Sequence, residues 1–207
     1  MMKNGRAFIV GNGQSRHGFD LNKLVGHGKI LTCNLAFQHF DNWKRDVDAV
    51  VALEEYRQEQ IKIAEVPKSK RIFPPWAEQF ELSQYHGGAA ARPRSNAGMN
   101  AIIEADRMGS RTIFLLGFDF IIDNEEMTTS NMFTGRKGTR TSLDDSIARV
   151  KYFDWFITNP YRHLHVFFVV PDRIGMKLRN VSAPNVVALT YPGLDKMMKG
   201  ELHAAAV

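Results

Sequence analysis

The chain has 207 residues, of which 44% are hydrophobic and 24% are charged, a balance that is typical of a globular protein with one well-buried core. Its apolar runs are much shorter than the roughly 20 residues that a membrane-spanning helix needs, and a single cysteine, Cys33, excludes an internal disulfide framework. We therefore expect a cytoplasmic protein with one domain over residues 1–202 and a frayed tail at 203–207.

The formal net charge of +5 favours anionic partners such as nucleotides, nucleic acid or acidic sugars. The basic residues are dispersed, with only two small clusters, at 68–71 and 136–140. The sequence carries no helix-turn-helix, zinc or RNA-stacking signature. Nucleic-acid binding is therefore the weakest of the functions that the charge suggests.

Predicted strands and helices alternate along the chain. Short apolar runs that end at Gly, Asn or Pro predict buried strands. These strands are expected at 7–10, 29–33, 48–53, 70–73, 111–117 with a continuation through 118–120, 165–170 and 185–189, and short helices at 19–24 and 55–65. A helix capped by Ser95 or Asn96 is expected to run to Met108. Another, capped by Ser142, is expected over 144–158 with Ile147 on its inner face.

This alternation predicts an α/β protein with a mostly parallel sheet and helices on both faces. Two segments interrupt the pattern. Residues 76–94 have no helical or strand periodicity, and residues 123–140 are polar and rich in Thr, Asn and Gly. We interpret the second segment as part of a flexible lid at about 121–141.

In parallel α/β sheets, ligands bind beyond the carboxyl ends of the strands. The first strand ends in a glycine-rich turn, Gly11-Asn12-Gly13-Gln14-Ser15, which could present backbone N–H groups to a phosphate. The turn is not the dinucleotide fingerprint, because Arg16 stands where a third glycine is expected, and a purely structural turn is the alternative. Asp119 is expected either to bind a metal ion or a ligand hydroxyl, or to secure a turn. The other candidates at strand ends are Asn34, Glu54, Glu55 and the helix start at 95–98.

Three blocks of residues in this order resemble a known family. They are Gly11-Asn12-Gly13-x-Ser15, Cys33-Asn34, and Gly98 with the later block Gly109-x-x-Thr112-Ile113-x-Leu115-x-Gly117-x-Asp119-Phe120. The set resembles the bacterial sialyltransferases that transfer sialic acid from CMP-sialic acid, and the related pterin-pyrophosphokinase-like Rossmann proteins. The resemblance covers residues 6 to about 158 and is strongest over 7–34 and 96–120.

The resemblance implies a Rossmann-like domain with a lid over a nucleotide-sugar donor. It implies that Asn12, Gly13 and Ser15 hold the CMP phosphate and ribose, that Asn34 contacts the donor, and that Gly98 lets a helix N-terminus approach it. The candidate nucleotide-binding set is then Gly11, Asn12, Gly13, Gln14, Ser15, Asn34, Asn96, Ala97, Gly98 and Asp119.

The chain departs from the family at the positions that carry the chemistry. Asn96-Ala97 replaces a Thr-Ser pair, two lid tyrosines fall near Ile121 and Met127, and an Asn-Pro pair is replaced by Glu54-Glu55. The family's catalytic histidine falls near Arg140, and arginine cannot act as a general base. Glu54 or Glu55 is therefore our candidate base, with His17 and His86 as weaker alternatives, and Arg140 with Arg136 and Lys137 would neutralise a departing phosphate.

The sequence thus predicts a sialyltransferase-like glycosyltransferase with an altered catalytic set. The alternatives are a nucleotide or nucleotide-sugar binding protein without catalysis and, more remotely, a nucleic-acid-binding protein. A CMP-sugar is the expected donor substrate and a glycan the expected acceptor. The sequence has no His/Cys/Asp cluster with metal-ligand spacing, so no cofactor is firmly implied. A phosphate-bound Mg²⁺ and association into homo-oligomers stay open.

Overall fold

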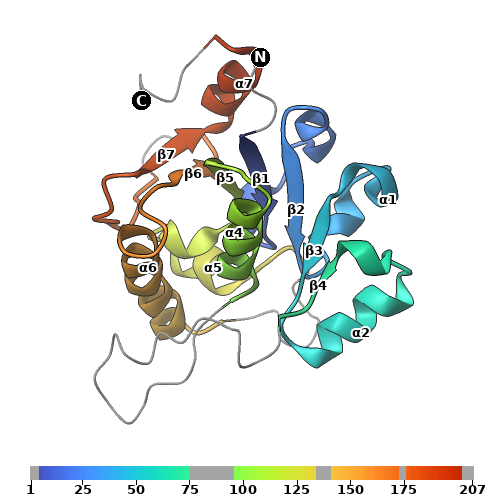
Figure 1. Cartoon of the computed structure of the whole chain (residues 1–207). Helices are drawn as coiled ribbons and strands as arrows, with labels where there is room; N and C mark the ends of the chain where they lie inside the picture. Colours follow the sequence, from blue (N-terminus) through green and yellow to red (C-terminus); the bar gives the residue numbers. More distant parts are fainter. Residues whose placement is uncertain (1–4, 75–95, 134–140, 173–175, 202–207) are drawn as a thin grey trace. The chain divides into compact units, whose positions relative to one another are not determined.

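The computed structural model describes residues 5–74, 96–133, 141–172 and 176–201 (Figure 1). The chain divides into two compact units, and each is described in turn. The first comprises the residues up to Asn12 together with Leu21–Arg111, and the second comprises Gly13–Asp20 together with the residues from Thr112 onward. Among the described residues, no helix combines the length and the apolarity that crossing a membrane requires.

The first unit contains four parallel strands in the order β4-β3-β2-β1. Their bounds are β1 Arg6–Val10, β2 Lys29–Cys33, β3 Ala49–Val51 and β4 Arg71–Ile72. In the register of the pairs, Val10 lies opposite Thr32 and Cys33 opposite Val51. After their first residue, β1 and β2 are buried at every position, and for this reason their residues are apolar, apart from Thr32, rather than alternating between apolar and polar.

The helical segments of the first unit connect these strands. They are the 3₁₀ helices η2 Leu21–Leu24, η3 Ala36–His39 and η4 Lys68–Lys70, and the α-helices α1 Trp43–Asp46, α2 Glu55–Ile63 and α4 Ala97–Arg107. Helix α4 packs across β1, β2 and β3 (Figure 1). It buries Met99, Ala101, Ile102 and Ala105 there.

The second unit contains three parallel strands in the order β5-β6-β7. Its elements are β5 Thr112–Leu116, β6 His165–Val170 and β7 Val186–Thr190, the 3₁₀ helices η1 Gln14–Arg16 and η6 Asp119–Ile121, and the α-helices α5 Glu125–Thr129, α6 Leu143–Thr158 and α7 Tyr191–Lys199. The ring centroid of Phe153, on α6, lies 4.8 Å from that of Phe168 and 5.8 Å from that of Phe120. This aromatic cluster joins α6 to β6 and η6.

The α/β class is confirmed, because all the strand pairs within each unit are parallel and helices alternate with strands in a Rossmann-like arrangement. The strands expected at 29–33 and 165–170 are found at those positions. Asn96 and Ser142 cap α4 and α6 as expected, by accepting the N–H of Met99 and of Asp145.

Three expectations about local structure were wrong or incomplete. Residues 118–120 do not continue β5, because Gly117 takes a φ of 72° and the chain turns into η6. Ile147 is 40% exposed, whereas Ser146 is buried and donates its hydroxyl to the Thr128 carbonyl. Helix α7 was not anticipated, although Thr190 caps it and Gly200 ends it with a φ of 79°, and both are recognisable sequence signals.

Candidate functional site

In the first unit, two asparagines lie just beyond the carboxyl ends of neighbouring strands. If the β1–β2 register is carried two residues past Val10 and Thr32, Asn12 aligns with Asn34. The side-chain Oδ1 atoms of both are buried, and neither has a hydrogen-bond partner among the described residues. A buried polar atom without a partner costs about 1–3 kcal/mol, so each oxygen is suited to accept a hydrogen bond from a ligand donor.

The backbone at Asn34 is a local turn. Its φ is 54°, in the left-handed region that asparagine tolerates better than most residues. Its N–H donates to the Val51 carbonyl oxygen at 2.9 Å, which ties the end of β2 to β3. The unpartnered amide oxygen therefore belongs to a residue whose backbone is held in place.

The start of α4 lies at the same end of the unit. Lys29, the first residue of β2, donates its ammonium group to the Met108 carbonyl, so the C-terminus of α4 lies at the amino end of β2. The eleven residues of α4 and the five of β2 each span about 16 Å. The N-terminus of α4 is therefore near the strand ends that carry Asn12 and Asn34.

The first turn of α4 combines a cap with a close-packed backbone. Asn96 uses its Oδ1 to accept the Met99 N–H at 2.9 Å, and its carbonyl oxygen accepts the Asn100 side-chain amide at 3.1 Å. Ala97 and Gly98 are buried. A helix N-terminus carries a partial positive charge and N–H groups that suit an anion. Together, Asn12, Asn34 and the start of α4 constitute what we call the strand-end site.

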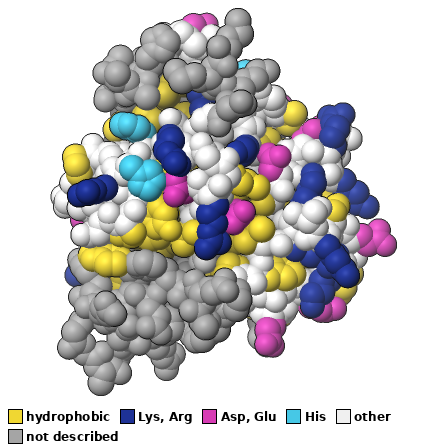
Figure 2. Space-filling view, viewed as in Figure 1, with side chains coloured by type: hydrophobic (Ala, Val, Ile, Leu, Met, Phe, Trp, Pro, Cys, Tyr) yellow, Lys and Arg dark blue, Asp and Glu magenta, His cyan; other side chains and the backbone are white. Residues whose placement is uncertain are grey.

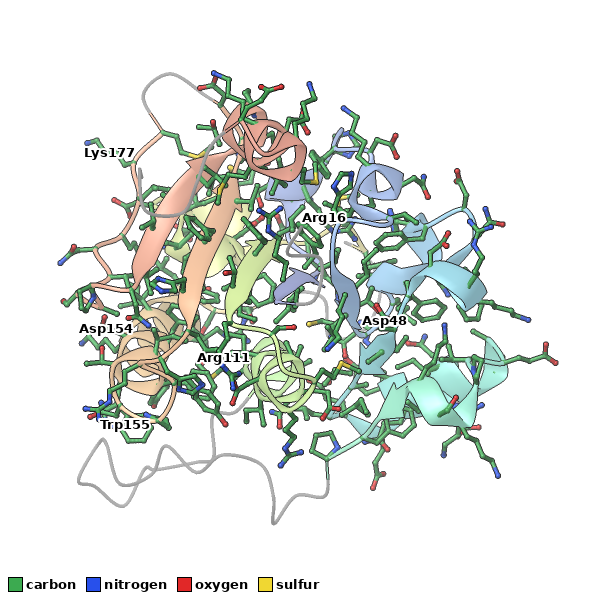
Figure 3. The ribbon with its side chains drawn as sticks, turned by 45° about the horizontal axis from the view of Figure 1, so that its top comes forward. Arg16, Asp48, Arg111, Asp154, Trp155 and Lys177 are labelled. Carbon is green, nitrogen blue, oxygen red and sulfur yellow. The ribbon has the colours of Figure 1, made fainter. Side chains whose placement is uncertain are left out.

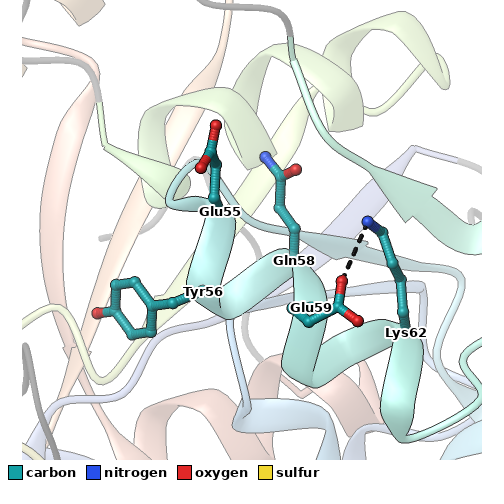
Figure 4. A pocket seen from close by; sticks show the side chains of 5 residues that line it. All are labelled: Glu55, Tyr56, Gln58, Glu59 and Lys62. Carbon is teal, nitrogen blue, oxygen red and sulfur yellow. Dashed lines mark hydrogen bonds and ion pairs between the residues drawn. The ribbon is translucent and has the colours of Figure 1, made fainter.

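The two candidate bases lie beyond the carboxyl end of β3, the strand that pairs with β2. Glu54 and Glu55 follow β3 and are exposed, and Glu54 begins α2 without a capping hydrogen bond from its side chain. Glu55 lines an open hollow of about 590 Å³ on α2, together with Tyr56, Gln58, Glu59 and Lys62 (Figure 4). In that hollow Glu59 pairs with Lys62 at 3.3 Å. The carboxylates of Glu54 and Glu55 are therefore both exposed to water.

In the second unit, the glycine turn is bonded to the end of β5. The Gly13 N–H donates to the Gly117 carbonyl at 2.9 Å, and the Ser15 N–H donates to Asp119 Oδ2 at 2.9 Å. The Ser15 hydroxyl donates to the other carboxylate oxygen. Of the two roles expected for Asp119, the structure shows the securing of a turn. The N–H groups of Gly13 and Ser15, expected to face a phosphate, are used within the protein.

Asp119 is a buried carboxylate with opposing influences on its pKa. It is 5% exposed, and this burial raises the pKa of its carboxyl group above the ordinary value. Hydrogen bonds from Ser15 and from the Gln14 backbone, and the charge of Arg16, act in the opposite direction. Arg16, labelled in Figure 3, is itself only 2% exposed.

Two residues outside the turn, Tyr191 and Asn131, also contact it. The Tyr191 hydroxyl donates to the Ser15 carbonyl at 2.8 Å, and its ring stacks on Phe19 with centroids 4.6 Å apart. Gln14 donates its side-chain amide to the Asn131 carbonyl at 3.2 Å. Tyr191 was not predicted from the sequence. The available signal was the Thr-Tyr-Pro-Gly segment, which marks the start of a helix but not a contact with Ser15.

The expected lid is described only in part. Its described part is held by Arg179, whose guanidinium donates to the Ile122 carbonyl and the Thr128 hydroxyl and also to the Phe120 carbonyl, which ties η6 to α5. Residues 136, 137 and 140, the basic set expected to neutralise a leaving phosphate and including Arg140, lie outside the described residues, as does His86. His17 is exposed. In the described parts of the chain, no three His, Cys, Asp or Glu side chains are grouped so that they could hold a metal ion.

The basic cluster at 68–71 is largely engaged in the fold. Lys70 donates to the carbonyls of Lys44 and Val47 at 2.8 and 2.6 Å, and Arg71 donates to the Val66 carbonyl at 2.6 Å. Figure 2 shows acidic side chains interspersed with the basic ones on the side of α1 and α2. These interactions do not favour the cluster as a phosphate-binding surface.

Comparisons with known proteins find no relative. No family model, no curated protein and no solved structure matches the chain.

Proposed function

We propose that the chain binds a nucleotide-sugar donor, CMP-linked, at the strand-end site and transfers the sugar to a glycan acceptor, as the sialyltransferases that it resembles do. The observation that carries this proposal is the pair of buried, unpartnered amide oxygens on Asn12 and Asn34 beside the start of α4. Cytidine and ribose offer amino and hydroxyl donors to such oxygens, and a helix N-terminus suits the phosphate.

In this proposal the helix start and the two asparagines bind different parts of the donor. Since the N–H groups of Gly13 and Ser15 donate to Gly117 and Asp119, the phosphate is assigned to the first turn of α4, where Gly98 has no side chain. Asn12 and Asn34 would then orient the nucleoside. Glu54 or Glu55 would act as the general base, and Arg140 would neutralise the departing CMP.

One observation favours the second candidate, a nucleotide-sugar binding protein without catalysis. Glu54 and Glu55 are both exposed, whereas a general base is usually tuned by burial or by neighbouring charges. Asp119, the buried carboxylate, is occupied by Ser15. A chain that kept the binding residues and lost the catalytic ones would have this arrangement.

Calorimetric titration with cytidine, CMP, CDP, UDP and CMP-sialic acid tests the binding step. We expect saturable binding that prefers cytidine nucleotides and weakens about tenfold in Asn12→Ala and in Asn34→Ala, because each loses a hydrogen bond worth about 1.4 kcal/mol. Asn180→Ala, which alters an exposed asparagine, should bind as the wild type does. Absence of binding to every cytidine nucleotide would overturn the proposal, and salt-sensitive DNA binding in its place would favour the nucleic-acid alternative.

Product analysis separates the two candidates. Incubation with CMP-sialic acid, with and without a glycan acceptor, should release CMP if the chain is a transferase. In that case Glu54→Gln or Glu55→Gln should lower kcat with little change in donor affinity. Tight donor binding without release of CMP would identify a binding protein instead.

A further inference from the structure

The glycine turn is held by groups that the sequence places far from it. Asp119 accepts hydrogen bonds from the Ser15 N–H and hydroxyl, and Tyr191 donates to the Ser15 carbonyl. We propose that Asp119 and Tyr191 are positioning residues: they hold residues 13–16 in one conformation and thereby restrict the backbone to which Asn12, the residue before Gly13, is bonded. The binding consequence rests on the proposed function, whereas the ordering of the turn does not.

Asp119 takes the place that an anion would occupy in such a turn. Both of its carboxylate oxygens are engaged with Ser15. A Cβ built on Gly13 would lie 2.6 Å from the Gly117 carbonyl oxygen and closer still to the Asp119 carboxylate, so only glycine allows this approach. The turn is therefore shaped around a protein carboxylate, and a ligand phosphate is directed elsewhere.

Tyr191 holds the same turn through the Ser15 carbonyl. Its hydroxyl reaches the Ser15 carbonyl at 2.8 Å across 176 residues of sequence. Its ring stacks on Phe19, the residue four positions later, with an angle of 22° between the ring planes. Asp119 thus accepts from the Ser15 N–H and hydroxyl, and Tyr191 donates to the Ser15 carbonyl. The chain that leaves the turn is held by the stacking of Tyr191 on Phe19.

A turn held in this way is ordered before any ligand arrives. Fixing backbone dihedral angles opposes binding when it has to occur on association, and preorganisation removes that cost. Loss of one of these hydrogen bonds should therefore weaken ligand binding even where the fold is intact. We expect an effect of up to about tenfold on affinity for one neutral hydrogen bond.

Tyr191→Phe is the decisive variant, because it keeps the stacking on Phe19 and removes only the hydroxyl. We expect faster hydrogen exchange of the amides of residues 13–16, an unchanged Tm, and CMP binding weakened about five- to tenfold. Tyr56→Phe, which alters an exposed tyrosine on α2, should change none of these.

Asp119→Asn provides a second test, because an amide offers one acceptor oxygen where the carboxylate offers two. It should accelerate exchange at Ser15, and adding Ser15→Ala should produce little further change, since the two side chains act as one unit. Wild-type exchange in both Tyr191→Phe and Asp119→Asn would overturn the positioning role. If the wild type binds no cytidine nucleotide, the proposed function fails, yet the exchange measurement still decides whether these residues hold the turn.

Discussion

Gly13→Ala is the sharpest test of the glycine turn. The backbone at Gly13 has φ −64° and ψ 153°, an extended conformation that alanine also adopts. At such a position, replacement of glycine by alanine ordinarily stabilises a protein by about 0.4–1 kcal/mol, because it restricts the unfolded chain. Any loss of stability must therefore come from what the new Cβ meets.

The structure gives the sign and the size of that loss. The Cβ would lie 2.6 Å from the Gly117 carbonyl oxygen and nearer to the Asp119 carboxylate. Overpacking of this kind costs about 1–3 kcal/mol, and weakening the bonds from Ser15 to the carboxylate adds about 1.5–3 kcal/mol. After subtraction of the unfolded-state gain, we expect Gly13→Ala to lower the free energy of unfolding by about 1.5–5.5 kcal/mol.

Urea titration at neutral pH measures this difference, provided that the slope of the unfolding free energy against urea is unchanged. Gly5→Ala is the matched control: nothing lies within 4 Å of its Cβ, so it should leave the free energy of unfolding unchanged or raise it by up to about 1 kcal/mol. Removing the carboxylate in the double variant Gly13→Ala/Asp119→Ala should recover part of the loss, while the clash with the Gly117 carbonyl remains. Equal stability of Gly13→Ala and Gly5→Ala would refute the close-approach argument.

Three other predictions concern the stability of separate parts of the chain. Because burial raises the pKa of Asp119, its contribution to stability is full below the ordinary value of 3.8 and is lost as the pH rises through the folded-state pKa. In urea titrations at successive pH values, the wild type should therefore lose stability relative to Asp119→Asn over that range. A stability difference that does not change with pH would contradict this. Asn96→Ala removes the cap of α4 and should cost about 1 kcal/mol in thermal unfolding, with Asn96→Asp largely retaining it. Phe153→Ala empties a site that is 1% exposed between Phe120 and Phe168 and should cost about 3–5 kcal/mol by calorimetry; a loss below 1 kcal/mol would mean that the aromatic cluster contributes little.

Local patterns predicted most elements of the fold. The run at 29–33 was predicted as a strand because a parallel strand buried on both faces is mostly apolar, and its last four residues are buried. Asn96 and Ser142 begin helices because their short side chains accept an N–H that the helix itself leaves unpaired. The orientation of α6 was harder to predict, since Tyr152 and Phe156 broaden its buried face and leave Ile147 exposed.

The partners within the site were beyond prediction from local patterns. The sequence by itself marked Gly13, Ser15 and Asp119 as candidate site residues, because each follows an apolar run at the predicted carboxyl end of a strand. Only the tertiary structure decided that Asp119 accepts hydrogen bonds from Ser15, 104 residues away in sequence, and that Tyr191 donates one to Ser15 across 176 residues. The physical reason is that hydrophobic periodicity is a property of neighbouring residues, whereas the pairing of a buried carboxylate with a turn depends on which strand ends the tertiary structure brings together.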